Sequence, residues 1–216
     1  MNAEIIRKLI DESIDLVRRN DLENAIRVSS QATMLASAAW RAKYDDNEPR
    51  QPELALALET GLNHALLFFM VEEYGEALNL AVMMDVMVDS DGVAPQTVAL
   101  QLMKLRTLAL DSLLHLLGRR PVTGDQQLKE HVTLSLLYLL GLTYSAYNDL
   151  INNDSGRPGD EVLQHTEGVM RYLTDNGMKI PSPLVDVNGT MTDPHHPAPI
   201  LGDLIGRMRA AGLTGE

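Results

Sequence analysis

Apolar side chains recur along the start of the chain with the spacing of an α-helix. Between residues 3 and 18 they stand at Ile5, Ile6, Leu9, Ile10, Ile14, Leu16 and Val17. Steps of three and four residues place such positions on one face of a helix, whereas a half-buried strand would alternate apolar and polar residues. The pattern therefore predicts a first amphipathic helix over residues 3–18.

The same period continues along most of the chain, interrupted by short polar segments rich in glycine, proline, asparagine and aspartate. The apolar stretches between these segments predict helices over about 21–44, 53–71, 75–88, 96–117, 128–150 and 161–175. No stretch alternates as a strand would. We therefore expect an all-α fold in which consecutive helices form antiparallel pairs.

The composition changes near residue 177. Five prolines fall between Met178 and Pro199, and because proline has no backbone N–H and a fixed φ, this span cannot form a regular helix. A last amphipathic helix is expected at about 200–211, which brings the total to about eight. We predict a helical array over 1–176, an extended proline-rich segment over 177–199, and a C-terminal region, 200–216, whose helix packs on the array.

Net charge and cysteine content exclude several kinds of partner and site. With 18 Lys and Arg against 30 Asp and Glu, the net charge is −12, which disfavours nucleic acid as a partner. There is no cysteine, which excludes disulfides, zinc–thiolate sites, iron–sulfur clusters and a thiol nucleophile.

The distribution of charges also bears on location. The N-terminal residues carry charges every few positions, where a signal peptide needs an apolar core, so we expect a cytoplasmic protein. The longest uncharged stretch, residues 132–148, is shorter than the roughly 20 residues of a membrane span, so no membrane insertion is expected.

The stretch "EEYGEAL" at 72–78 joins two predicted helices and resembles the turn of a tetratricopeptide repeat. In that family an aromatic residue packs into the helix pair and a small residue admits the partner helix. Residues 20–32 resemble the same turn, and "LLGLTY" at 139–144 resembles the start of a repeat. The matching positions are Leu22 and Ala25 in one window, Tyr74, Ala77 and Ala81 in the second, and Gly141 and Tyr144 in the third.

The resemblance implies a right-handed array of helix pairs that binds a protein or peptide partner in a groove. Positions that would face this groove hold Ile10, Ile14, Leu62, Leu66, Phe69 and Met70. Because these side chains are apolar, they imply an apolar peptide or helix rather than a carboxylate as ligand. The alternative is that later parts of the chain itself cover this face.

Few residues are candidates for catalysis or metal binding. His195 and His196, beside Asp193, are candidate metal ligands, although adjacent residues of an extended chain point to opposite sides. Glu161 and His165 are four positions apart on a predicted helix, a spacing that suits two ligands as well as an ordinary surface contact. The methionines at 83, 84 and 87 are typical of adaptable binding surfaces or of core filling.

The sequence contains no phosphate-binding loop, dinucleotide fingerprint or nucleophile elbow. We therefore expect a non-catalytic interaction or scaffold module without a cofactor. Two alternatives stay open. One is a small all-α enzyme or metal-binding protein that uses histidines and carboxylates of the C-terminal third. The other is a structural protein that associates with copies of itself.

Overall fold

The computed structural model describes residues 3–45, 50–92, 95–119, 122–124, 126–152 and 161–177. Over these residues it contains seven α-helices, one short 3₁₀ helix and no strand, which confirms the all-α fold class. The chain divides into two compact units, Met1–Val93 and Ala94–Glu216. This division falls inside the predicted array of residues 1–176. The proline-rich segment and the last predicted helix lie outside the described residues.

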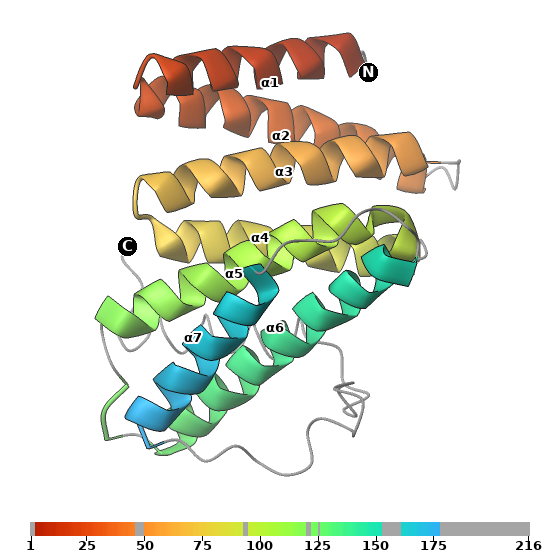
Figure 1. Cartoon of the computed structure of the whole chain (residues 1–216). Coiled ribbons are helices and arrows are strands. Elements are labelled where there is room, and N and C mark those ends of the chain that lie inside the picture. Colours follow the sequence, from red (N-terminus) through yellow and green to blue (C-terminus); the bar gives the residue numbers. More distant parts are fainter. Residues whose placement is uncertain are drawn as a thin grey trace. The chain divides into compact units, whose positions relative to one another are not determined.

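The first unit consists of α1 (Ala3–Arg18), α2 (Leu22–Asp45), α3 (Gln51–Met70) and α4 (Tyr74–Asp91). Successive helices run in opposite directions, and each packs against the next in sequence (Figure 1). The predicted ranges differ from these bounds by at most three residues at either end. The periodic spacing of apolar residues therefore predicted the positions of these four helices.

The turn between α1 and α2 is closed by a left-handed residue. Asn20 has φ of 60°, and its N–H donates to the carbonyl of Val17 at 2.9 Å. The N–H of Asp21 donates to the carbonyl of Leu16, also at 2.9 Å. This pair of bonds is a Schellman motif, which satisfies carbonyls that the end of a helix leaves free.

The turn between α3 and α4, within "EEYGEAL", repeats this geometry. Glu72 has φ of 65°, and its N–H donates to the carbonyl of Phe69 at 3.0 Å. The N–H of Glu73 donates to the carbonyl of Phe68 at 2.9 Å. The two left-handed residues are 72 − 20 = 52 positions apart, so two helical hairpins with equivalent turns follow one another along the chain.

Small residues after each turn allow the two helices of a hairpin to approach closely. Ala25 of α2 and Ala77 of α4 are both fully buried, and Ala81 is 2% exposed. Ser13 of α1 donates its hydroxyl to the carbonyl of Ala25 at 3.2 Å, which joins the first pair. Tyr74, at the start of α4, is also buried.

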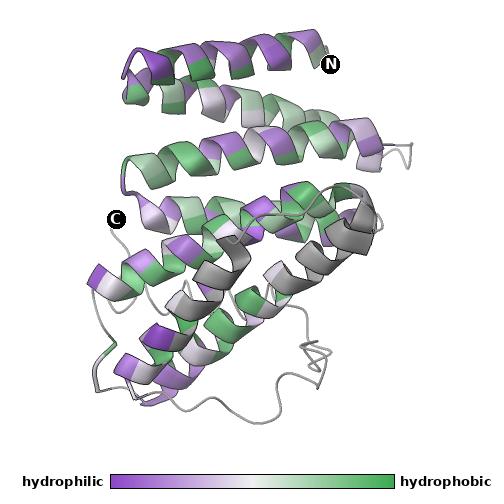
Figure 2. Cartoon of the chain, in the orientation of Figure 1, coloured by the Kyte–Doolittle hydropathy of each residue, from purple (hydrophilic) through white to green (hydrophobic). Residues whose placement is uncertain are grey.

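One hydrophobic cluster of the first unit lies between α1, α2 and α3. It is formed by the buried side chains Ile6, Ile10, Ala32, Ala36 and Ala57, flanked by Leu9, Leu35, Leu56 and Met87. Three of the five buried residues are alanines, so the backbones of these helices can pack closely. The hydropathy of the helices differs along the chain: α1 shows alternating bands, whereas the C-terminal half of α3 is mostly hydrophobic (Figure 2).

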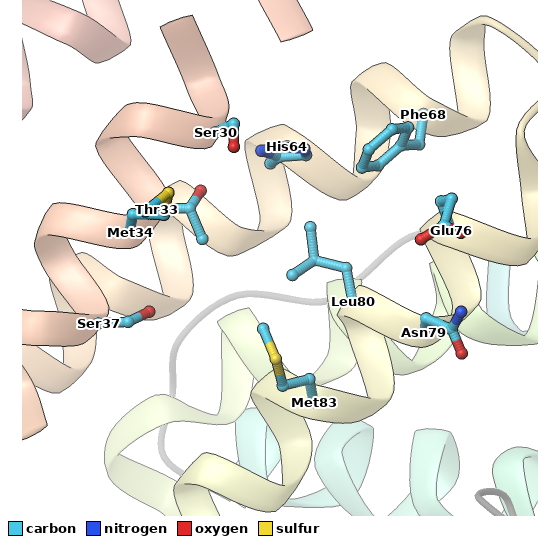
Figure 3. Close-up of a pocket in the computed structure, with 10 residues that line it drawn as sticks. All are labelled: Ser30, Thr33, Met34, Ser37, His64, Phe68, Glu76, Asn79, Leu80 and Met83. Atoms are coloured by element: carbon cyan, nitrogen blue, oxygen red, sulfur yellow. The ribbon is translucent and has the colours of Figure 1, made fainter. Parts of the chain in front are cut away.

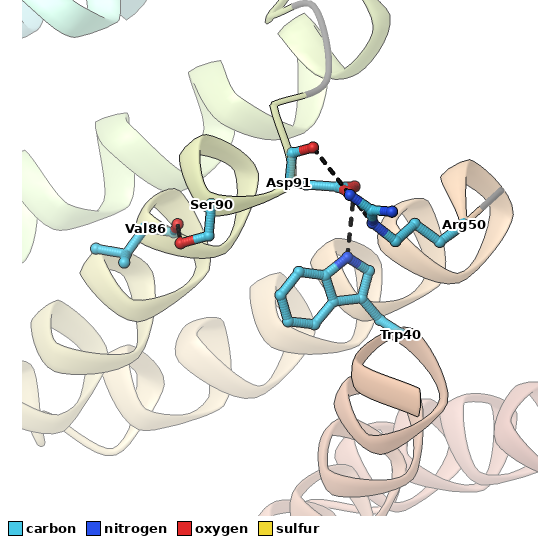
Figure 4. Close-up of polar contacts among 5 residues, drawn as sticks. All are labelled: Trp40, Arg50, Val86, Ser90 and Asp91. Carbon is cyan, nitrogen blue, oxygen red and sulfur yellow. Dashed lines mark hydrogen bonds and ion pairs between the residues drawn. The ribbon is translucent and has the colours of Figure 1, made fainter. Parts of the chain in front are cut away.

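A polar cluster connects the C-terminal ends of α2 and α4 with the residue that precedes α3 (Figure 4). Asp91, the last residue of α4, forms an ion pair with Arg50, which precedes α3, and accepts a hydrogen bond from Trp40 Nε1 at 3.4 Å. The Arg50 guanidinium also lies over the ring of Tyr44 in α2, 4.8 Å from its centroid. Pro52 lies in the first turn of α3, where no backbone N–H is required.

The second unit contains η1 (Pro95–Val98), α5 (Ala99–Arg119), α6 (Gln126–Asn152) and α7 (Glu161–Asp175). Helices α5 and α6 pack along each other, and α7 contacts both. The buried Arg106 of α5 donates to the carbonyl of Leu142 in α6 at 3.1 Å. Gly141 is half-buried in α6, and Tyr144 lies in the same helix with its side chain outside the described part. None of the described helices is long and apolar enough to cross a bilayer.

Candidate functional site

A pocket of about 370 Å³ opens on the first unit between α2, α3 and α4 (Figure 3). Each helix contributes residues three, four or seven positions apart, which is the spacing of a single helix face. The apolar lining consists of Met34 from α2, Phe68 from α3, and Leu80 and Met83 from α4. Met34 is 69% exposed and Met83 is 51% exposed, so two flexible thioether side chains stand at the opening.

Polar side chains complete the wall of the pocket. They are Ser30, Thr33 and Ser37 from α2, His64 from α3, and Glu76 and Asn79 from α4. Of these six polar residues, only Glu76 carries a formal charge at neutral pH when His64 is neutral. The pocket contains neither lysine nor arginine. It is therefore suited to an uncharged or weakly cationic group and unsuited to an anion.

His64 is the buried titratable group of this pocket. Only 6% of the residue is exposed, and this burial lowers the pKa of His64 below its usual 6.5, while a hydrogen bond with the backbone of Ser29 partly opposes the effect. The imidazole is therefore neutral at pH 7. Its ring packs against that of Phe68 with the centroids 4.6 Å apart.

Two polar atoms among the pocket residues have no hydrogen-bond partner within the described structure: Nδ1 of His64 and Oγ of Ser37. The neighbouring Thr33 differs, because its hydroxyl lies 2.9 Å from the carbonyl of Ser29 and 3.1 Å from that of Thr60. Buried polar atoms are nearly always paired, so each unpaired one requires an explanation. These two atoms distinguish the pocket from an ordinary apolar gap between helices.

The residues predicted to line a groove lie elsewhere. Ile10 is part of the core, whereas Ile14, Leu66 and Met70 are 41%, 41% and 53% exposed. Leu62 and Phe69 are half-buried, and the Phe69 ring meets that of Tyr74 edge-on at 5.0 Å.

The predicted groove and the pocket occupy different sides of α3. Leu66 follows His64 by two residues, which corresponds to a rotation of about 200° around the helix. The exposed residues Leu66 and Met70 therefore face away from the pocket. The structure brings together His64 and Phe68, which the predicted groove did not include.

The predicted metal candidates do not converge on a site among the residues described. That part of the chain contains no group of three histidine or acidic side chains able to hold an ion. His165 of α7 pairs instead with Asp111 of α5, Nε2 to Oδ1 at 2.8 Å. Glu161 begins α7, but its side chain lies outside the described part, as do His195 and His196.

The pocket does not follow from the sequence pattern, although two of its residues, His64 and Met83, carry a signal there. His64 interrupts the apolar run "GLNHALLFFM", and a single polar side chain within an apolar helix face is a candidate for a buried site. The predicted methionine cluster separates in the structure, because Met84 is fully buried and Met87 flanks the core, whereas Met83 lines the pocket.

Comparison of the chain with protein-family models, with curated proteins and with solved structures finds no match.

Proposed function

We propose that the chain is a non-catalytic interaction module whose first unit binds an apolar peptide or helix of a protein partner. The observation that carries the proposal is the pocket, whose lining combines the exposed Met34 and Met83 with the apolar Phe68 and Leu80. Exposed methionines cost free energy in water and adapt their shape to a ligand, as in surfaces that bind amphipathic helices. The pocket lies between α2 of one hairpin and the α3–α4 hairpin, where a partner segment can lie between helix pairs.

The proposal extends to the architecture. We regard the hairpins α1–α2 and α3–α4 as two irregular tetratricopeptide-like units. This assignment is supported by their equivalent Schellman turns and by the buried Ala25 and Ala77 at corresponding positions. In arrays of helical hairpins the concave surface formed by successive hairpins is the usual binding surface.

The test is a comparison of three immobilised proteins: the wild type, the double variant Met34→Glu/Met83→Glu, and Met70→Glu. Two carboxylates in the pocket opening would have to be desolvated by an apolar partner, so we expect the double variant to lose the proteins that the wild type retains from a lysate. Met70 is also an exposed methionine but lies outside the pocket, so its variant controls for added charge.

Mass spectrometry of the retained proteins and thermal melts of all three variants complete this test. A partner lost with the double variant but kept with Met70→Glu supports the proposal. Identical sets of retained proteins for the three folded variants would contradict it.

A second copy of the chain is the alternative occupant, and the same exposed Met34 and Met83 favour it. Light scattering distinguishes the two cases. Self-association through the pocket predicts a wild-type mass that rises with concentration and a monomeric mass for the double variant. A monomeric wild type would exclude self-association and leave the heterologous partner.

A further inference from the structure

The protonation state of His64 indicates which kind of group the pocket can accept. The hydrogen bond between its ring and the Ser29 backbone raises the pKa, as donation from the ring to a carbonyl does. Since Nδ1 has no partner, the donating atom is Nε2. In a neutral imidazole with hydrogen on Nε2, the other nitrogen carries a lone pair and accepts hydrogen bonds. Nδ1 of His64 is therefore an unpaired buried acceptor.

The other residues that line the pocket favour a ligand with an aromatic or otherwise apolar group. The Phe68 and His64 rings lie side by side, and the Met34 and Met83 side chains can place sulfur against the edge of an aromatic ring. A volume of about 370 Å³ is at the small end of the range for ligand pockets, which suits one ring system rather than a large ligand. The carboxylate of Glu76 and the absence of a cation among the lining residues disfavour an anionic occupant.

We propose that this pocket receives one aromatic side chain of the partner, an indole or a phenol, whose N–H or O–H group donates a hydrogen bond to Nδ1 of His64. The inference rests on the proposed function and specifies the side chain by which the partner is anchored. Nδ1 exposes less than 1 Å², so a donor can reach it only when neighbouring side chains move aside, and we expect Met34 and Met83 to do so. The hydroxyl of Ser37, which is also buried without a partner among the described residues, offers a second hydrogen-bonding group in the pocket wall.

The experiment uses two isomeric probes of equal size. The first, 3-methylindole, has the structure of a tryptophan side chain and carries the N–H donor, whereas in 1-methylindole the methyl group replaces that hydrogen. Each is titrated into the full chain with ¹³C-labelled methionine methyl groups, of which there are 11. Signals are assigned with the Met34→Leu, Met70→Leu and Met83→Leu variants.

We expect 3-methylindole to shift the methyl signals of Met34 and Met83 and to leave that of Met70 unchanged. It should bind about fivefold more tightly than 1-methylindole, as expected for the net contribution of one hydrogen bond. In His64→Phe, which keeps a ring without an acceptor, the two isomers should bind equally. The comparison on the wild type stands by itself if this variant does not fold.

Two results would overturn the inference. One is the absence of shifts at Met34 and Met83 up to the solubility limit of the probes. The other is equal affinity of the wild type for the two isomers. The second result would leave the interaction module in place, because a partner could still be lost with Met34→Glu/Met83→Glu. Conversely, a failed partner capture would not alter the binding of 3-methylindole.

Discussion

At the scale of single residues, Gly61 sets the distance between α3 and α4. A Cβ atom built on Gly61 would lie closer to Sδ and Cγ of Met84 than non-bonded atoms can approach. Met84 is fully buried, so its side chain has little room to move away. The absence of a side chain at Gly61 therefore allows the thioether of α4 to pack directly on the backbone of α3.

We predict that Gly61→Ala lowers the free energy of unfolding by about 1–3 kcal/mol, as overpacking of a core does. Urea denaturation measures the change. Gly118→Ala is the matched control, because Gly118 is also helical but a Cβ there has nothing within 4 Å. The control should be neutral or stabilising, since alanine favours the helix over glycine. Equal effects of the two substitutions would show that the contact with Met84 is unimportant.

Glu72 is a second residue under local constraint, because a left-handed backbone brings its Cβ close to a carbonyl oxygen. We predict that Glu72→Gly stabilises the protein by roughly 1 kcal/mol, since glycine has no Cβ. Asn20→Gly at the equivalent turn should stabilise less, because asparagine tolerates this conformation better than glutamate. Thermal melts of both variants test the order, and a loss of stability in Glu72→Gly would contradict it.

At the scale of helices, the polar cluster around Asp91 fixes the end of α4 to the start of α3 and to α2, at the ends of the hairpins that no short turn closes. The carboxylate, whose side chain is 4% exposed, pairs with Arg50 and accepts a hydrogen bond from Trp40. It thereby connects α4 with the start of α3 and with α2. The opposite ends of the hairpins need no such contact, because short turns join the helices there.

We predict that Asp91→Ala lowers the free energy of unfolding by about 3 kcal/mol, because it removes the buried carboxylate that pairs with the half-buried Arg50 and accepts a hydrogen bond from Trp40. Glu4→Ala is the comparison: the ion pair of Glu4 with Lys8 is 2.9 Å long but mostly exposed, so its loss should be undetectable. Urea denaturation of both variants measures the difference. A change in Asp91→Ala as small as that in Glu4→Ala would mean that the cluster does not hold the helix ends.

At the scale of the whole molecule, stability should fall in acid through two groups that titrate in different windows. Burial lowers the pKa of His64 below 6.5. For Glu53, burial alone would raise the pKa, but the hydrogen bond and charge of Lys43, at 2.8 Å, together with a backbone hydrogen bond, outweigh it and hold the pKa below 4.5. In both cases the unfolded chain binds the proton more readily than the folded chain.

For His64 the consequence is a loss of stability that begins when the pH falls below about 6.5, where the unfolded chain becomes protonated first. The loss continues until the pH reaches the folded pKa. We predict that the free energy of unfolding decreases as the pH falls through about 6.5, and that His64→Phe removes much of this slope. The loss of stability due to Glu53 begins only below about pH 4.5 and remains in His64→Phe. Denaturation curves across this range provide the test, and an unchanged slope in His64→Phe would refute it.

The positions of the helices follow from the order of apolar and polar residues along the chain. The apolar period predicted α1 through α7 because helix contacts involve residues only three or four positions apart. The turns at residues 20 and 72 close with the same pair of backbone hydrogen bonds, each within six residues of the chain. Such features depend on neighbours in sequence, so they can be predicted without knowing which helices meet.

Tertiary structure alone decided where the pocket lies and which residues form it. His64, Met34 and Met83 belong to three helices, and no periodicity within one helix indicates that they share a surface. The same holds for Arg50 and Asp91, which are 41 positions apart. A helix face that looks suited to a groove can also become core, as Ile10 shows. The reason is physical: a helical period specifies a face, whereas the packing of other helices determines whether that face is filled, exposed or left as a cavity.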